Sequence, residues 1–210
     1  MGNGMGMNKT LNKVGIFGGT FDPIHTGHLL AAQEAAFKLE LEEIWFMPTG
    51  EPWLKEGNTV SSAANRLAML ELAIGNNNIF KSCSIEMNIP GPSYTVETLG
   101  QISKAGYLGK PFFIIGRDSL DTLPRWHEPA LLFDLCNLVV INRPTHLNIN
   151  LDSIEKIKPG SSRDITFLDS LKVDISGTEI RRRVSEHNPI TYWVPDGVER
   201  YIYENNLYRE

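Results

Sequence analysis

Short apolar runs rich in β-branched and aromatic residues alternate along this chain with longer segments in which apolar residues recur every three or four positions. The runs 13–17 and 43–47 predict strands, and the segments 27–39 and 61–74 that follow them predict helices. Strands and helices that alternate in this way build a parallel sheet covered by helices. We therefore expect an α/β protein.

The same alternation continues to the end of the chain. Near the C-terminus, Ser176 and Glu179 have the spacing of a capping box, so a helix is expected to open near Thr178. Pro195 begins a last segment whose apolar residues can pack back onto the sheet. The other expected elements are a strand within 79–89, a helix over 95–105, and strands over 112–115 and 137–142.

The composition fits one folded domain. With 210 residues, 41% of them hydrophobic and 21% charged, the chain can bury a substantial core. We expect a single domain over 13–210 that follows a flexible tail, rich in Gly and Asn, over 1–12. This tail lacks the basic start and the apolar stretch of a secretory signal.

Charge and cysteine content exclude several classes of protein. The formal charge of −5 gives no overall basic field, so nucleic acid is not an expected partner. Cys83 and Cys136 form no CxxC pair, which disfavours a disulfide framework or a cysteine zinc site and favours the cytoplasm. Apolar runs such as Phe112 to Ile115 are far shorter than the ~20 residues that span a bilayer, so no membrane span is expected.

The densest chemical signal is GIFGGTFDPIHTGHLL, residues 15–30. An apolar strand runs there into Gly18, Gly19 and Thr20, and a proline turn then leads into a helix. Unpaired amides and aligned peptide dipoles at a helix N-terminus favour phosphate, and glycines let phosphate oxygens approach the backbone. Neither GxxxxGKS/T nor GxGxxG is present, so P-loop hydrolysis and dinucleotide hydride transfer lose their main support.

His25 and His28 stand three positions apart at the start of that helix, so both imidazoles fall on one face. Two ring donors can stabilise charge that gathers on phosphoryl oxygens, with a worth of ~2–4 kcal/mol for each well-aimed donor. The alternatives are a helix-capping pair or a metal pair. Zinc would need a third ligand, and none is near in the sequence, so no metal ligand is assigned.

A second candidate anion site lies in DISGTEIRRRV, residues 174–184. Ser176 and Thr178 mark a capped helix start, and Arg181, about one turn further on, can reach back over it with a charged fork. The plain alternative for the three consecutive arginines is a solvated basic face, which is the common fate of such a run. The presence of the first motif favours the phosphate site.

GGTFDPIHTGHL together with ISGTEIRRRV resembles the nucleotidyltransferase superfamily that carries an HxGH motif and an ISSTxxR-like motif on a doubly wound sheet. The likeness to the bacterial nicotinate-nucleotide adenylyltransferases within it extends over residues 13–208. It implies a Rossmann-like parallel sheet in a single domain with a small helical part at the C-terminal end. The stretches similar in order and spacing are PSYTVETL (92–99), FFIIGRDSLDTLPRWHEP (112–129), the Arg143-Pro144 strand end and YWVPDGVERYIYENNLY (192–208).

The resemblance implies transfer of the AMP group of ATP to the phosphate of nicotinate mononucleotide, which gives deamido-NAD and pyrophosphate in NAD biosynthesis. Magnesium is implied as the companion of ATP, held mainly by the phosphates. In-line displacement needs aligned phosphates and neutralised charge, and the attacking phosphate is already ionised, so no general base is required. The sequence is compatible with a monomer or a homo-oligomer.

The matching positions imply roles for individual residues on the ATP side of the site. Asp118 resembles the family's acid near the nucleotide ribose, and its plain alternative is a helix N-cap. The residues implied to hold the ATP phosphates and the transition state are Gly18, Gly19, Thr20, Phe21, His25 and His28 from one side, and Ser176, Thr178 and Arg181 from the other.

Other matching positions are implied to bind the pyridine nucleotide. Tyr94, Thr95 and Trp126 occupy the places that the family uses there, where a flat ring can stack on aromatic side chains and a carboxylate can take hydroxyl or amide donors. Their plain alternative is core packing. Lys55, in the loop 48–60 that we expect to be mobile, can reach a phosphate, although an exposed lysine is usually a solvated charge.

Three positions depart from the family pattern. Gly177 stands where the family usually has a serine, so one hydroxyl is missing from the phosphate motif. Pro52-Trp53-Leu54-Lys55 replaces the family's PPHK, and Arg117 replaces a small residue between Gly116 and Asp118.

Two other functions stay open on the sequence. One is nucleotidyl transfer to another phosphate acceptor, such as phosphopantetheine, a polyol phosphate or nicotinamide mononucleotide. The other is a regulatory module that binds nucleotide without turnover. The second predicts damage to the phosphate donors, whereas both histidines and Arg181 are intact.

Overall fold

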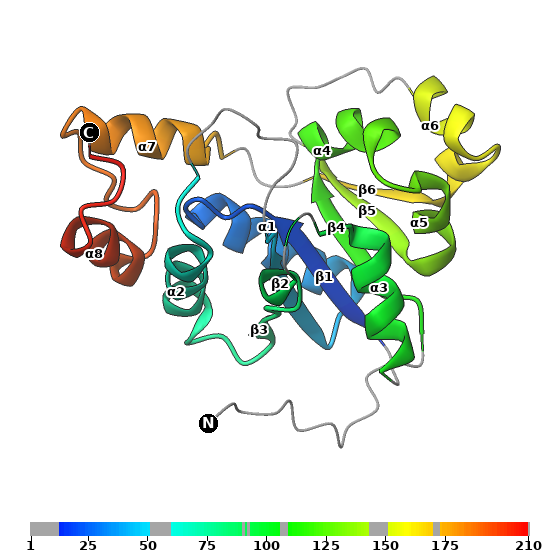
Figure 1. Ribbon diagram of the computed structural model, residues 1–210, viewed down its shortest axis with the longest axis horizontal. Helices are drawn as coiled ribbons and strands as arrows, with labels where there is room; N and C mark the ends of the chain where they lie inside the picture. Colours follow the sequence, from blue (N-terminus) through cyan, green and yellow to red (C-terminus); the bar gives the residue numbers. More distant parts are fainter. Residues whose placement is uncertain are drawn as a thin grey trace.

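The computed structural model describes residues 13–50, 60–89, 91, 93–105, 109–142, 151–169 and 173–209. Within these residues, six parallel strands form one central sheet (Figure 1). In chain order the strands are β1 (Val14–Gly19), β2 (Glu43–Pro48), β3 (Phe80–Ser82), β4 (Phe112–Gly116), β5 (Asn137–Asn142) and β6 (Ile165–Asp169).

The strand order β3-β2-β1-β4-β5-β6 is that of a doubly wound sheet. The chain builds outward from β1 to β3, then returns to place β4 on the other side of β1 and continues to β6. The order reverses between β1 and β4, and ligands bind at the carboxyl ends of such a pair of strands. The predicted α/β class with a doubly wound parallel sheet is thereby confirmed.

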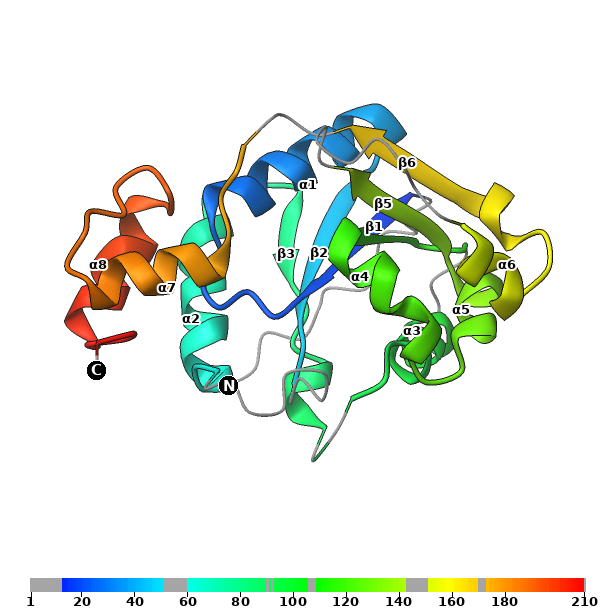
Figure 2. The same ribbon diagram turned by 90° about the horizontal axis from the view of Figure 1, so that it is seen from above.

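Helices cover both faces of the sheet (Figures 1 and 2). One face packs on α1 (Thr26–Leu39) and α2 (Ala63–Ile74), with α7 (Gly177–Ser185) and α8 (Asp196–Glu204) completing the same core. The other packs on α3 (Thr95–Lys104), α4 (Arg117–Thr122), α5 (Pro129–Leu135) and α6 (Asp152–Ile157). Both views place α7 and α8 together at the end of the molecule beyond α2.

Alternate side chains of the central strands feed these two cores. In β4, Ile114 is buried in the core under α1 and α2, whereas Phe113 and Ile115 are buried in the core under α3 and α5. Successive side chains of a strand point to opposite faces, so a strand covered on both faces reads as a continuous apolar run. This explains why the short strands stand out in the sequence.

The predicted elements match the observed ones to within a few residues at their ends. The segment 79–89 holds only a three-residue strand, β3, followed by the 3-10 helix η2 (Glu86–Asn88). Ser176 caps α7 through its Oγ, which accepts from the Glu179 amide at 3.2 Å. The tail 1–12 lies outside the described residues.

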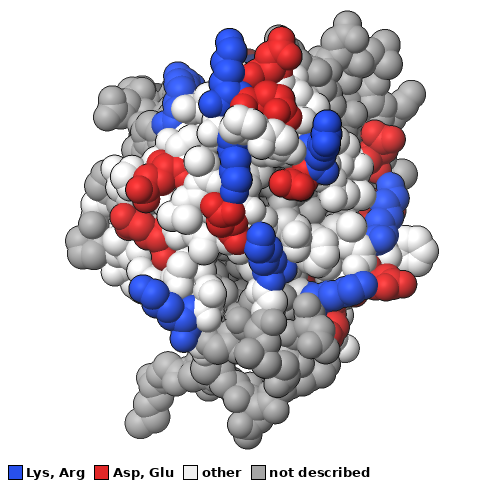
Figure 3. Space-filling model, turned by 90° about the vertical axis from the view of Figure 1, so that its right-hand side faces the viewer, with Lys and Arg blue, Asp and Glu red and all other residues white. Residues whose placement is uncertain are grey.

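Acidic and basic side chains interleave on the face shown in Figure 3. Lys158 and Asp134 form an ion pair of 2.5 Å, and Lys158 lowers the pKa of that carboxyl. In the described part of the chain, no helix is long and apolar enough to cross a membrane.

Candidate active site

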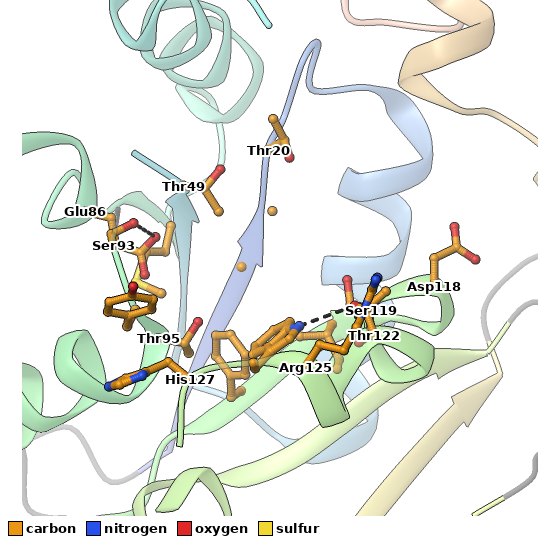
Figure 4. Close-up of a pocket in the computed structure, with 17 residues that line it drawn as sticks. Thr20, Thr49, Glu86, Ser93, Thr95, Asp118, Ser119, Thr122, Arg125 and His127 are labelled. Atoms are coloured by element: carbon orange, nitrogen blue, oxygen red, sulfur yellow. Dashed lines mark hydrogen bonds between the residues drawn. The ribbon is translucent and has the colours of Figure 1, made fainter. Parts of the chain in front are cut away.

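A cavity of about 330 Å³ lies at the carboxyl ends of β1 and β4, where the strand order reverses. Figure 4 shows its polar side chains, with Thr20 from the end of β1 on one side and His127 and Arg125 on the other. The cavity joins half of the predicted site residues in one space, namely Gly18, Gly19, Thr20, Tyr94, Thr95, Asp118 and Trp126. Its lining does not include Phe21, His25, His28, Ser176, Thr178 or Arg181.

The loop between β1 and α1 (residues 20–25, called the phosphate loop after its predicted role) ends at His25, and His28 follows in the first turn of α1. His25 is the N-cap residue of α1, and its ring stacks on that of His28 with centroids 3.6 Å apart. Nδ1 of His28 accepts from the His25 amide at 3.3 Å, so a neutral His28 carries its ring proton on Nε2. Gly27 leaves room for the stacked ring of His25, because a Cβ at this position would lie 3.1 Å from Nδ1 of His25.

Phe21 supports these rings and is itself buried, with only 2% of its surface exposed. Its ring meets His28 edge-on with centroids 5.1 Å apart, and Phe17 also packs on it. The Phe21 side chain therefore offers almost no surface to ATP, the ligand that the family resemblance implies for it. The geometry gives this side chain the task of holding His28 in place.

Some backbone amides at the N-terminus of α1 already donate hydrogen bonds within the protein. The Thr26 amide donates to the Trp193 carbonyl at 2.9 Å, and the His28 amide donates to the His25 carbonyl at 2.9 Å. Two of the first amides of α1 are therefore engaged within the chain, which the sequence interpretation of free amides did not anticipate.

The start of α7 lies directly against the phosphate loop. Nη1 of Arg181 donates to the Asp22 carbonyl at 2.6 Å, and Nη2 reaches Thr178 Oγ1 at 3.4 Å. A Cβ on Gly177 would stand 2.8 Å from the same carbonyl oxygen. A serine at this position would therefore displace the loop, which gives a physical reason for the departure from the family pattern.

The neighbouring arginines have ordinary surface roles. Arg182 pairs with Glu179 at 2.7 Å and with Glu186 at 2.6 Å, and the first of these pairs lowers the pKa of Glu179. Arg183 lies over the Trp193 ring at 4.4 Å. The plain alternative of a basic surface face thus describes Arg182, whereas Arg181 contacts the phosphate loop.

Arg66 on α2 organises the backbone behind the cavity. Only 2% of this residue is exposed. Nη1 donates to the carbonyls of Thr20 and Thr49 at 3.0 and 2.7 Å, Nη2 to that of Gly50 at 2.7 Å, and Nε to that of Ser61 at 3.1 Å. One guanidinium thereby fixes the phosphate loop, the end of β2 and the start of α2.

Aromatic side chains form the predicted pyridine side of the cavity. The Trp126 indole donates through Nε1 to Thr122 Oγ1 at 3.3 Å and meets Phe113 edge-on with centroids 6.4 Å apart. The Tyr94 ring lies 4.3 Å from the ring of His127 at 32°. Flat faces at such sites can stack on a pyridine ring.

A buried carboxyl group lies at one wall of the cavity. Glu86 is 2% exposed and accepts a hydrogen bond from Ser93 Oγ at 3.0 Å (Figure 4). It accepts a second one from Thr98 Oγ1 at 3.2 Å. Burial raises the pKa of Glu86, and the two hydroxyl donors oppose that rise. The contacts fix the start of α3, where Tyr94 and Thr95 face the cavity.

Asp118 and Arg117, which directly follow β4, have different surroundings. Gly116, and not Asp118, is the N-cap of α4, so Asp118 lines the cavity from the first turn as an exposed carboxylate. Arg117 turns elsewhere and pairs with Asp121 at 3.2 Å, its side chain 11% exposed. Of the two side chains, that of Asp118 lines the cavity, whereas that of Arg117 forms an ion pair within α4.

The cavity also has lining residues that sequence reasoning did not assign. Ser93, Arg125 and His127 fall inside stretches already quoted for the family resemblance, so their positions carried a signal. Thr49 and Glu86 carried none, because each stands alone in an ordinary loop sequence. Lys55, the rest of its motif and Arg143-Pro144 lie outside the described residues.

Comparison with known proteins identifies relatives over nearly the whole chain. A family model described as cytidylyltransferase-like matches residues 16–183. The chain is 40% identical over 197 residues to a probable nicotinate-nucleotide adenylyltransferase of Dehalococcoides mccartyi, covering 93% of this chain and 97% of the relative. It is 41% identical over 208 residues to the one of Shewanella pealeana, covering 94% and 96%.

Solved structures share the fold. The nicotinic acid mononucleotide adenylyltransferase of Plasmodium falciparum in complex with NaAD superposes with a TM-score of 0.74 at 20% identity, over 93% of this chain and 97% of that one. Its complex with APC gives 0.72 at 20% identity, over 93% and 96%. The chain therefore belongs to the cytidylyltransferase-like family and, within it, to the nicotinate-nucleotide adenylyltransferases.

Proposed function

We propose that this protein transfers the adenylyl group of ATP to the phosphate of nicotinate mononucleotide, with deamido-NAD and pyrophosphate as products. The observation that carries the proposal is the arrangement of two neighbouring groups of residues. Stacked His25 and His28 meet the helix of Arg181 at the phosphate loop, and an aromatic-walled cavity opens beside Gly18 and Gly19. The curated relatives carry the name of this activity.

On the ATP side the protein supplies charge and position. A phosphate oxygen of nicotinate mononucleotide attacks the α-phosphorus of ATP, and the bond from that phosphorus to the bridging oxygen breaks, which releases pyrophosphate. Charge gathers on the phosphoryl oxygens as this happens. We assign the Nε2 hydrogen of His28, the ring of His25 and the guanidinium of Arg181 to its stabilisation.

No proton has to be removed from the nucleophile, because a phosphate monoester is already ionised at neutral pH. The protein therefore needs no general base, and alignment of the two phosphates supplies much of the rate. We assign Tyr94, Thr95 and Trp126 to holding the pyridine nucleotide in that alignment, with Asp118 near the ribose of a bound nucleotide.

Magnesium enters this proposal with the substrate. In the described part of the chain, no three His, Cys, Asp or Glu side chains gather into a group that could hold a metal ion. We propose that Mg²⁺ arrives on the ATP phosphates, whose oxygens and bound waters supply its ligands and which it helps to neutralise. None of the residue roles above depends on a protein ligand to the metal.

The test is an end-point and rate assay with purified protein, ATP and Mg²⁺, and one acceptor at a time. We expect deamido-NAD and pyrophosphate with nicotinate mononucleotide, and kcat/KM at least about 10-fold lower with nicotinamide mononucleotide. Pyrophosphate release with phosphopantetheine and none with nicotinate mononucleotide would assign another acceptor. Nucleotide binding without release of pyrophosphate from any acceptor would assign a regulatory module.

Two substitutions test the histidine roles. His25→Ala and His28→Ala should each lower kcat by ~100-fold or more, because each removes a donor to the transition state. The matched control is His187→Asn, an exposed histidine at a left-handed position (φ 59°) that asparagine tolerates. A kcat in both alanine variants equal to that of the control would remove the assigned role.

A further inference from the structure

The C-terminal segment of the chain contacts the phosphate loop at Asp22 and the first residue of α1 at Thr26. Tyr208, the third residue from the end, donates from its hydroxyl to Oδ1 of Asp22 at 2.6 Å, across 186 positions of sequence. Thr26, at the first turn of α1, is held by the Tyr192 carbonyl through Oγ1 at 2.9 Å and by the Trp193 carbonyl through its amide at 2.9 Å. The end of the chain thus closes around the loop that presents the histidines.

Asp22 is the point on which these contacts converge. It is 5% exposed, and the second oxygen of its carboxylate accepts from the Ser61 amide at 3.2 Å. Its main-chain carbonyl accepts from Arg181. Asp22, three residues ahead of His25, thereby joins the phosphate loop to the residues just before α2, to α7 and to the C-terminal segment.

The Tyr208 hydroxyl is suited to donate a hydrogen bond to Asp22. Burial raises the pKa of its phenol, and the negative charge of Asp22 raises it further. The hydroxyl therefore stays protonated over the range in which the enzyme works. A neutral phenol donating to a carboxylate is one of the stronger protein hydrogen bonds, and 2.6 Å is within the short range that such bonds show.

We propose that Tyr208 is a positioning residue for adenylyl transfer, acting through Asp22 to hold the phosphate loop in the geometry that places His25 and His28 against ATP. The inference rests on the proposed function and extends it to a part of the chain distant from the histidine motif. Without the hydroxyl, a buried carboxylate oxygen loses its donor, and the loop shifts to bring that oxygen to water. A small displacement of catalytic groups is enough to slow an in-line transfer.

The test compares substitutions of two tyrosines whose hydroxyls donate to different partners. Tyr208→Phe removes the donor to Asp22, and Tyr201→Phe is the matched control, because Tyr201 in α8 donates to Asn65 in α2 at 3.0 Å, away from the phosphate loop. We expect kcat to fall about 10-fold in the first variant and less than about 2-fold in the second. KM for nicotinate mononucleotide should stay within about 2-fold in both, because the pyridine side is untouched.

A double-mutant cycle identifies the route. Asp22→Ala removes both carboxylate oxygens. If Tyr208 acts through Asp22, then Tyr208→Phe in an Asp22→Ala background should change kcat by less than about 2-fold. Full additivity of the two substitutions overturns the proposal. So does an equal effect of Tyr208→Phe and Tyr201→Phe on kcat, since a general loss of stability would act through either residue.

Hydrogen exchange of the backbone amides reports directly on the phosphate loop. Its result does not depend on which phosphate substrate accepts the adenylyl group. Amides of residues 20–28 should exchange about 10-fold faster in Tyr208→Phe than in Tyr201→Phe, measured in folded protein well below the melting temperature. Equal exchange in that peptide would overturn the proposal even if kcat changed. A wild-type enzyme that forms no deamido-NAD would instead contradict the proposed function and leave this comparison intact.

Discussion

The two walls of the site are built by contacts of very different range along the chain. On the ATP side, Arg181 reaches Asp22 across 159 positions and Tyr208 reaches it across 186. On the pyridine side, Glu86 holds Ser93 and Thr98 across 7 and 12 positions. The first wall exists only once the C-terminal helices have docked, whereas the second is assembled within one stretch of chain.

The chemistry of the two walls differs in the same way. The ATP wall holds charged and backbone groups in fixed places, which is what stabilisation of phosphoryl charge requires. The pyridine wall presents aromatic faces such as Trp126, whose contribution depends on area and tolerates small movements. A single lost contact should therefore damage the ATP wall more than the pyridine wall, and substitutions can be ranked on that basis.

The largest effect is expected from Arg66→Met. The substitution keeps an apolar stem of similar length but leaves four carbonyls without this donor, of which that of Gly50 is buried and the others are part-buried. We expect a loss of roughly 3–5 kcal/mol in the free energy of unfolding, measured by urea denaturation. The matched control is Arg182→Met, at an exposed arginine with two surface ion pairs, where the cost should stay below about 1 kcal/mol. Equal losses in the two variants would show that the guanidinium does not hold the loops.

A smaller effect is expected where α7 touches the phosphate loop. In Gly177→Ala the new methyl group would meet the Asp22 carbonyl at 2.8 Å, so helix and loop must move apart. Overpacking of this kind costs about 1–3 kcal/mol in the free energy of unfolding. The same movement lengthens the contact from Arg181, so we also expect kcat to fall about 10-fold.

Gly100 offers a matched control for this substitution. It lies within helix α3, and a Cβ there would meet nothing within 4 Å. Gly100→Ala should therefore raise the free energy of unfolding by about 0.5–1 kcal/mol, because alanine loses less backbone entropy in a helix. Thermal and urea denaturation of the pair measure both signs, and a Gly177→Ala variant as stable as Gly100→Ala would mean that α7 and the phosphate loop do not touch as described.

The range of these contacts also explains what the sequence could and could not predict. The apolar runs predicted five of the six strands of the doubly wound sheet, because each run is a local pattern. The edge strand β6 was not predicted, and its burial is incomplete. The histidine and Arg181 motifs were found because each is a compact pattern. Arg66 and Tyr208 were missed, since nothing near either residue indicates a partner that folding alone supplies.

One interpretation of the histidine motif was wrong, and three short helices were not predicted. The helix amides of α1 were expected to be free for phosphate, yet the Thr26 amide is bound by the carbonyl of Trp193, a residue 167 positions later. The short helices α4, α5 and α6 have six or seven residues, too few for a helical period to appear in the sequence. In each case the missing information lies in tertiary contacts and not in local pattern.

The smallest effect is expected from Glu86→Gln, on the pyridine wall. The pKa of Glu86 is raised in the folded protein above its usual 4.5 by burial. Below about pH 4.5 the carboxyl is protonated in both the folded and unfolded chain, and above it the unfolded chain loses its proton first. The folded state then binds more protons than the unfolded state, so the stability contributed by this group falls as the pH rises through its folded pKa.

Glutamine does not titrate, and its amide can still accept from one hydroxyl and donate to the other, at Ser93 and Thr98. The difference in melting temperature between Glu86→Gln and wild type should therefore move in favour of the variant between about pH 4 and pH 7, by a few degrees at most. Differential scanning calorimetry over that range measures it. A difference that stays constant with pH would show that Glu86 is ionised as readily in the folded chain as in the unfolded one, and the pyridine wall would then hold a full buried charge beside the site for an acidic substrate.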